Sequence, residues 1–162
     1  AVFIGVFVAN VLTIERMTAL QARGVKTIST TDDDVELPED QQALLDQAAG
    51  RLLLFQLTGP MIFGVAKTIS REHNAIEDCE AVLFDLTEVS HLGVTASLAL
   101  ENAIKEAVEV GRSVYLVVMN GSTRNRLEKL KLLELLPQNH VSENREEILR
   151  RAVGELPVLQ EV

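Results

Sequence analysis

Three short apolar runs recur along the second part of the chain. They span residues 52–57 (LLLFQL), 81–86 (AVLFDL) and 114–119 (VYLVVM). A run of this length that is apolar at nearly every position is typical of a strand covered on both faces, as in a parallel sheet. We therefore predict three central strands that are buried on both sides.

The stretch between the second and third runs has the period of an amphipathic helix. Over residues 94–110 the apolar positions recur three and four apart, and charged residues occupy the other face. Gly111 follows where a C-terminal cap is expected. The predicted helix packs one apolar stripe on the sheet. This stripe consists of Leu100, Ala103, Ile104, Ala107 and Val108.

Turn residues predict two more helices. Gly59 and Pro60 form a turn after the first run, and a helix over residues 61–74 begins just after that proline. Residues 123–136 form a leucine-rich helix that Pro137 ends.

A last helix is predicted near the C-terminus. Ser142 or Asn144 can cap it, Glu146 and Glu147 suit its first turn, and it runs to about residue 153. Strands and helices thus alternate three times, which predicts the α/β class, with a mixed sheet that has a parallel centre and is covered by helices.

The residues just before the first run, 24–50, are more polar. Residues 24–30 (GVKTIST) predict a short first strand, and residues 32–49 hold seven acidic residues and no Lys or Arg. Pro38 can open an acidic helix there and Gly50 can close it. The adjacent carboxylates of residues 32–34 point in different directions, so they predict a solvated loop and not a metal site.

The first fourteen residues differ from all others. Residues 1–14 (AVFIGVFVANVLTI) contain eleven apolar residues and no charge. A helix of this length is about 21 Å long, shorter than the roughly 30 Å hydrocarbon core of a bilayer. The basic residues Arg16, Arg23 and Lys26 follow this segment, which suits the cytoplasmic flank of a membrane helix better than a signal peptide. We predict the end of a transmembrane helix; a buried helix of a soluble protein is the alternative.

Charge and motifs exclude several function classes. The net charge is −9, tryptophan is absent and aromatic residues make up 4% of the chain, which argues against nucleic-acid binding. The single cysteine, Cys79, allows no internal disulfide, and its acidic neighbours should raise its pKa. The sequence lacks phosphate-loop, nucleophile-elbow and paired-histidine motifs, so we expect no enzyme, no metal and no cofactor.

One segment has an unusual order of residues. Asp85 ends a buried strand, a short loop rich in hydroxyl groups follows, and a helix then begins near Thr95. Thr87 and Ser90 belong to this loop. Asp85 and Thr87 can brace the turn while Thr95 caps the helix. Alternatively, the hydroxyls could accept phosphate near the positive helix end, although no Lys or Arg lies between Arg71 and Lys105 to pair with it.

Two segments carry a resemblance to a known family. Residues 53–67 (LLFQLTGPMIFGVAK) resemble the start of the transporter branch of STAS domains, and residues 85–100 (DLTEVSHLGVTASLAL) resemble the STAS switch loop. In the first segment the resemblance rests on the turn motif Gly59, Pro60, Phe63 and Gly64. Together with residues 1–14, the chain is similar to the C-terminal end of SulP anion transporters, most of all to the BicA-type sodium-dependent bicarbonate transporters.

The resemblance implies a STAS fold and a division of the chain. Residues 1–14 end the last transmembrane helix, 15–50 link it to the domain, 51–153 form the STAS core and 154–162 a tail. It implies a domain on the cytoplasmic side of the cell inner membrane, which serves dimerisation, stability and regulation of transport. The implied partners are a second copy, the chain's own transmembrane domain and, through residues 1–14, the lipid bilayer. Sodium is expected only in the membrane domain.

The switch loop departs from the family pattern. Gly93 replaces the family's Asp, Val94 its first hydroxyl residue and Ala96 its glycine, whereas Thr95 matches the hydroxyl that is phosphorylated in anti-sigma-factor antagonists. A free-standing antagonist of that kind, switched at Thr95, is the alternative function. The apolar residues 1–14 favour the transporter domain, because a soluble antagonist has no use for them.

Overall fold

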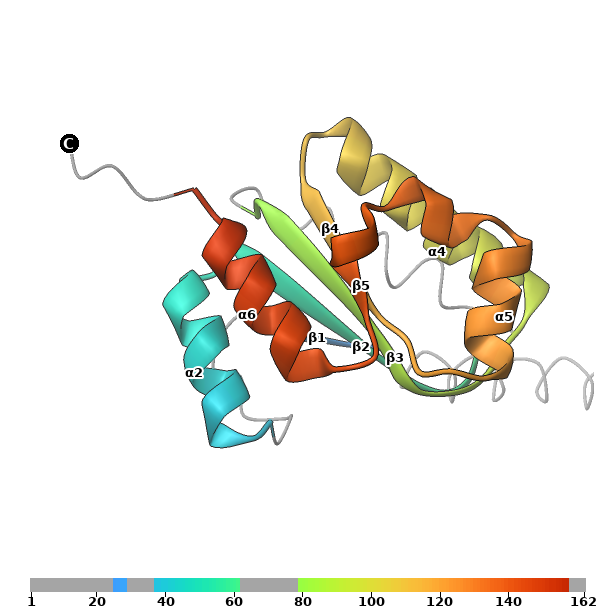
Figure 1. The fold of residues 1–162 in the computed structure, drawn as a ribbon, viewed down its shortest axis with the longest axis horizontal. Helices are drawn as coiled ribbons and strands as arrows, with labels where there is room; N and C mark the ends of the chain where they lie inside the picture. Colours follow the sequence, from blue (N-terminus) through green and yellow to red (C-terminus); the bar gives the residue numbers. More distant parts are fainter. Residues whose placement is uncertain (1–24, 29–36, 62–78, 158–162) are drawn as a thin grey trace, which may run out of the picture.

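The computed structural model describes residues 25–28, 37–61 and 79–157, which contain one five-stranded sheet (Figure 1). Its strands are β1 (Val25–Ile28), β2 (Leu52–Met61), β3 (Ala81–Leu92), β4 (Ser113–Val117) and β5 (Val141–Ser142), and they lie in that order across the sheet. β1 pairs with β2 antiparallel, and the other neighbours are parallel. This confirms the predicted α/β class and the parallel centre. The predicted membrane segment, residues 1–14, lies outside the described residues.

Helices cover both faces of this sheet. The helices α2 (Glu39–Ala48) and α6 (Arg145–Glu155) lie on one face. On the other face lie α4 (Val94–Glu109), α5 (Ser122–Lys129) and the 3-10 turn η1 (Leu132–Leu135) (Figure 1). A second 3-10 turn, η2 (Gln138–His140), leads into β5.

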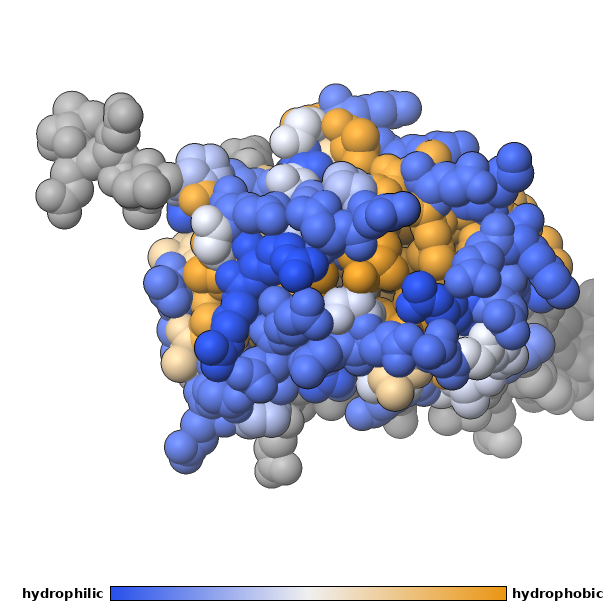
Figure 2. Space-filling view, in the orientation of Figure 1, coloured by the Kyte–Doolittle hydropathy of each residue, from blue (hydrophilic) through white to orange (hydrophobic). Residues whose placement is uncertain are grey.

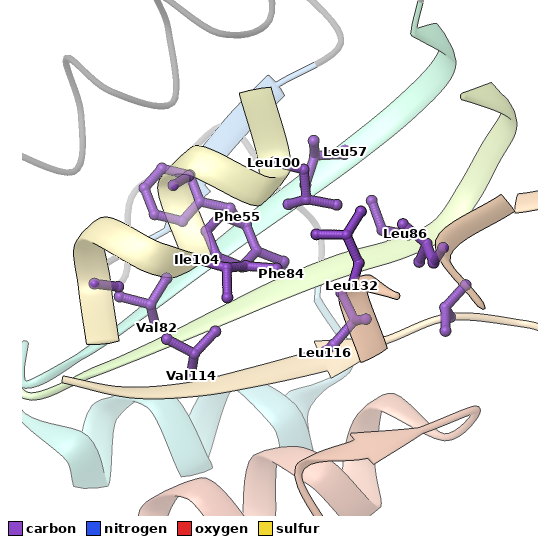
Figure 3. Packing of buried hydrophobic residues seen from close by; sticks show 14 of the residues in the cluster. Phe55, Leu57, Val82, Phe84, Leu86, Leu100, Ile104, Val114, Leu116 and Leu132 are labelled. Carbon is purple, nitrogen blue, oxygen red and sulfur yellow. The ribbon is translucent and has the colours of Figure 1, made fainter. Parts of the chain in front are cut away.

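The sheet separates two apolar cores because alternate residues of a strand point to opposite faces. In β2, Leu53, Phe55 and Leu57 join the core under α4, whereas Leu52 and Leu54 join the core under α2 and α6. The Phe55 ring stacks on that of Phe84 in β3, with centroids 5.4 Å apart (Figure 3). Burial of these runs on both faces is what their apolar sequence predicted.

The predicted turn at Gly59 and Pro60 is wrong. β2 continues through both residues to Met61, which pairs with Leu92 of β3. The register shifts on either side of Thr58, and Gly59 takes a positive φ of 76°, so a bulge absorbs the glycine and the proline without ending the strand. Met61 therefore does not begin a helix. The rest of the predicted helix over 61–74, including Phe63 and Gly64, lies outside the described residues.

The predicted loop after Asp85 is also wrong. β3 does not end at Asp85 but continues to Leu92, because it keeps pairing with the extended β2. Beyond Leu86 the strand is exposed except at Val89 and Leu92, whose side chains reach the core under α4. The hydroxyl-rich segment is thus a strand that leads directly into α4.

The predicted helix over 94–110 is confirmed as α4, and it ends in a Schellman motif. Gly111 has a φ of 82°, its N–H donates to Val108 O, and Arg112 N–H donates to Ala107 O. Four of the five predicted stripe residues are buried, but Val108 is 49% exposed. It lies in the last turn of α4, where the following residues Glu109 and Val110 are also exposed.

The elements after α4 agree with the prediction only in part. The third strand is shorter than predicted, and the helix predicted over 123–136 is broken, because Lys131 has a φ of 57° and separates α5 from η1. The last helix is confirmed as α6: the side chain of Asn144 accepts the N–H groups of Glu146 and Glu147. The acidic helix begins after Pro38 as predicted, and Ala49 and Gly50 end it with positive φ angles.

Candidate functional site

Asp85 lies at the centre of the segment that the sequence singled out. It is 1% exposed, and its Oδ1 accepts the N–H of Thr87 at 2.9 Å and also the Thr87 hydroxyl. Its Oδ2 lies 2.5 Å from Nε of Arg145, the first residue of α6. The two atoms are at ion-pair distance without the alignment of a hydrogen bond. Asp85 therefore bonds Thr87, as predicted, but it braces a continuing strand and not a turn, and it also ties β3 to α6.

The hydroxyls of the segment are placed differently from one another. Thr87 and Ser90 are exposed on β3, and only Thr87 bonds Asp85. Thr95 lies exposed in the first turn of α4, but it does not cap the helix. The N-cap is Gly93, which has no side chain to accept the first N–H groups. The predicted capping role of Thr95 is thus wrong, because the helix begins two residues earlier than a threonine cap would require.

Ser97 is the hydroxyl that is built into the fold. It is buried, donates to Gly93 O at 2.8 Å and accepts a hydrogen bond from Arg126 Nε at 3.2 Å. Arg126 belongs to α5, so a basic residue does reach the first turn of α4, although none is close in the sequence. The hydroxyl of Thr123, also in α5, donates to Val89 O of β3 at 3.1 Å.

These contacts make the segment from β3 into α4 a junction of three elements. α6 holds it through Arg145, and α5 holds it through Thr123 and Arg126. All three partners were missed by sequence reasoning, because they lie far along the chain and belong to no motif. Only the presence of a buried carboxylate, Asp85, signalled that a basic partner had to exist.

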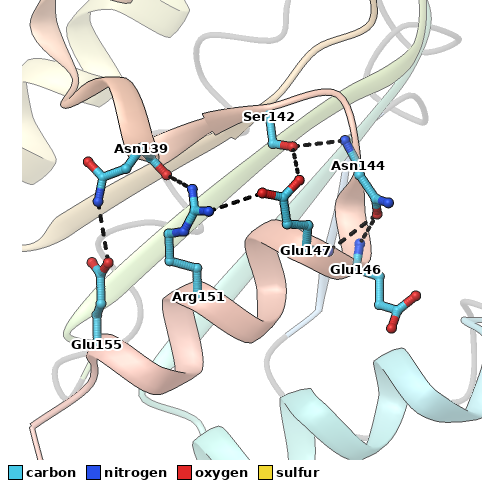
Figure 4. A network of polar contacts seen from close by, with 7 residues as sticks. All are labelled: Asn139, Ser142, Asn144, Glu146, Glu147, Arg151 and Glu155. Atoms are coloured by element: carbon cyan, nitrogen blue, oxygen red, sulfur yellow. Dashed lines mark hydrogen bonds and ion pairs between the residues drawn. The ribbon is translucent and has the colours of Figure 1, made fainter.

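A second polar network fixes α6 to the edge of the sheet (Figure 4). Glu147 accepts from the Ser142 hydroxyl at 2.9 Å and from Arg151 at 3.0 Å, and Arg151 also donates to Asn139 O. At the other end of the helix, Glu155 accepts from the Tyr115 hydroxyl at 2.7 Å.

His140 stacks on the ring of Tyr115, with centroids 4.3 Å apart. Burial, and next the bond to Glu155, raise the pKa of Tyr115. The β4 strand is thereby locked to the last turn of α6.

Cys79 is a buried thiol that donates to Ala81 O at 3.0 Å. Its pKa is raised as predicted, but burial is the main cause and the neighbouring Glu80 contributes least. Arg112 acts in the opposite direction. Such a thiol is a poor nucleophile.

The part of the chain that the structure describes holds no group of three His, Cys, Asp or Glu side chains that could bind a metal ion. Within that part, no helix is long and apolar enough to cross a membrane. His91 is exposed on β3, and His140 takes part in the network around Tyr115, so the two lie in different places. The arrangement at the junction is suited to holding elements together and to presenting a surface.

Comparison with known proteins finds one family and two similar full-length proteins. The STAS domain family profile matches residues 44–148. Two proteins named bicarbonate transporter BicA are 58% identical (Synechocystis sp.) and 59% identical (Picosynechococcus sp.) over 153 residues, which is 94% of this chain. The chain spans 27% of the length of each. These relatives are transporters, which agrees with the prediction that the chain is not an enzyme.

A solved structure shares the fold. The crystal structure of a sulfate transporter family protein from Wolinella succinogenes superimposes with a TM-score of 0.58 at 18% identity, covering 77% of this chain and 93% of that one.

Proposed function

The chain belongs to the family of STAS domains, and from that premise we propose that it is the cytoplasmic regulatory domain of a SulP-type bicarbonate transporter. The observation that carries this proposal is the identity of 58–59% to two bicarbonate transporters, which extends over 94% of the chain. Because the chain spans about a quarter of those proteins, the anion and sodium sites belong to the remainder, in the membrane domain. Residues 1–14 join the two parts at the inner membrane.

The exposed apolar side chains support a role in assembly. Among the described residues, large apolar side chains that are well exposed lie on α4, on η1 and in the segments that flank α4 and α5, and none lies on α2 or α6. On the face shown in Figure 2, apolar surface gathers on the side of α4. Val94 and Leu98, one turn apart, are 62% and 51% exposed. Exposed apolar surface of this kind is typical of a protein contact, here with a second copy or with the membrane domain.

The internal contacts support stability as the second role. The Asp85–Arg145 pair and the network around Glu155 fix α6 against the sheet at both of its ends. On the other face, the bonds from Thr123 and Arg126 of α5 hold the start of α4 in one arrangement, as a scaffold for a paired transporter requires. The segment containing Asp85, Thr87, Ser90 and Thr95 then acts by contact and not by phosphorylation.

Exchange of the domain tests this function. The matching segment of the Synechocystis bicarbonate transporter is replaced by this chain, and uptake of labelled bicarbonate is measured beside a version that lacks the segment. We expect the exchanged transporter to reach the membrane, to form dimers and to take up bicarbonate, while the truncated version is impaired. An exchanged transporter that is as impaired as the truncated one, at equal abundance in the membrane, contradicts the proposal.

A further inference from the structure

A groove between the end of β3 and α5 has an unusual lining. It has a volume of about 330 Å³, and its lining consists of His91, Leu92, Ser122, Asn125, Arg126 and Lys129. Two of these six residues are permanent cations, one is a histidine, two carry hydrogen-bond donors and none is acidic. In a chain with a net charge of −9, such a concentration of donors and positive charge is local and specific.

The spacing of the residues on α5 explains how the groove is built. Ser122, Asn125, Arg126 and Lys129 recur three and four apart, so they share one face of the helix. The opposite face carries Thr123 and Leu127, which are buried against the sheet. The bond from Thr123 to Val89 fixes the helix against β3, so the polar face of α5 is held beside His91 and Leu92.

The two cations are free to meet a ligand. Arg126 uses its Nε for Ser97, and no carboxylate of the described residues pairs with its guanidinium or with the ammonium of Lys129. The neighbouring Arg124, by contrast, is paired with Glu128 and Glu143. The bond to Ser97 also orients the Arg126 side chain in advance, which lowers the entropic cost of binding.

We propose that this groove binds a phosphate group. A guanidinium fork, an ammonium, a hydroxyl and an amide are the donors that phosphate oxygens accept most strongly. The volume is about ten times that of one water, so the groove also holds part of the molecule that carries the phosphate. That molecule is a free phosphorylated compound or a lipid headgroup, and both share the recognised chemistry. The proposal does not depend on the transport function.

Titration of the 162-residue chain with inorganic phosphate tests the first source. Amide chemical shifts are followed by NMR against chloride at equal ionic strength. We expect saturable shifts centred on residues 91–92 and 122–129. Arg126→Gln and Lys129→Gln should each weaken binding about tenfold, the loss of one charge-assisted contact. Lys131→Gln, which removes the same charge two residues beyond the groove, should leave the affinity unchanged.

Sedimentation with vesicles tests the second source. Phosphatidylcholine vesicles with and without phosphatidylglycerol are compared for the same variants. Because residues 1–14 are apolar, the readout is not total binding but the gain caused by phosphatidylglycerol. If Lys129→Gln reduces that gain and Lys131→Gln does not, the groove binds the phosphate of a lipid headgroup. If only inorganic phosphate binds, the ligand is a free phosphorylated compound.

Two results overturn the proposal. The first is that Arg126→Gln and Lys129→Gln match Lys131→Gln in both assays. The second is that Lys129→Gln lowers only the thermal stability, which would mean that these residues serve the last turn of α5 alone. Circular dichroism of each variant shows that loss of binding is not loss of folding.

Discussion

Replacement of Arg145 tests the ion pair that joins β3 to α6. Asp85 is 1% exposed and the side chain of Arg145 18%, so both charges are largely removed from water. If Arg145 is replaced by Met, Asp85 keeps the Thr87 contacts but loses its counter-charge, and breaking a buried pair in this way costs about 3 kcal/mol or more. Asp85→Asn keeps an oxygen for Thr87 and leaves a partly hydrated arginine, so we expect a smaller loss of about 2 kcal/mol.

The double variant decides whether the two residues act as a pair. Asp85→Asn combined with Arg145→Met removes both charges, so its free energy of unfolding should fall by about 2–3 kcal/mol, less than the sum of the single losses. Urea unfolding followed by circular dichroism measures all three. Arg150→Met in the same helix is the matched control. Its pair with Glu146 is exposed and should contribute less than about 1 kcal/mol. Additive losses, or an Arg145→Met variant as stable as the control, would refute the reasoning.

Three further predictions concern single residues. Tyr115 is the only tyrosine, and because its pKa is raised in the folded state, its contribution to stability is complete below its ordinary pKa of about 10 and is lost as the pH rises above that value. Absorbance titration and unfolding at rising pH should show this loss, and Tyr115→Phe should abolish it. Cys79 should react slowly with a thiol reagent at neutral pH and rapidly after unfolding, because burial raises its pKa; equal rates in both states would contradict its placement. Gly111→Ala should cost about 1 kcal/mol through its positive φ, although no atom obstructs the new methyl group, whereas Gly154→Ala inside α6 should be neutral or stabilising.

The sequence predicted the features that depend on local pattern. The apolar runs of β2, β3 and β4 are buried on both faces because almost every residue in them is apolar. The period of residues 94–110 and the caps at Gly111 and Asn144 likewise act within a few residues. For that reason they could be recognised without knowing the rest of the fold.

Features that depend on pairing between distant residues could not be predicted. Gly59 and Pro60 end many strands, but here the continuing β3 supplies a partner that carries β2 past them. The break at Lys131 in a leucine-rich stretch follows from the packing of Leu132 and Leu136 into the core under α4. The partners of Asp85 and Ser97 are Arg145 and Arg126, and nothing in their local sequence marks them.

In residues 85–95, the resemblance to the STAS switch loop led to wrong structural predictions. Its hydroxyl-rich sequence suggested a loop with Thr95 as a cap, but the structure extends β3 through it and gives the N-cap to Gly93. Ser97, for which no role was predicted, makes the contacts instead. The contacts of each residue here depend on the pairing of β3 with β2 and on the residue at which α4 begins, and a motif specifies neither.

The most direct test of the transporter assignment compares two domains that share the fold. The initial rate of bicarbonate uptake is measured for the Synechocystis transporter carrying either this chain or the Wolinella succinogenes domain, at equal abundance in the membrane. This chain is 58% identical to the host transporter over the matched residues. The other domain has the same fold as this chain but is only 18% identical to it. We expect uptake close to that of the parent with this chain and a clear loss with the other domain. Equal loss with both would contradict the transporter assignment.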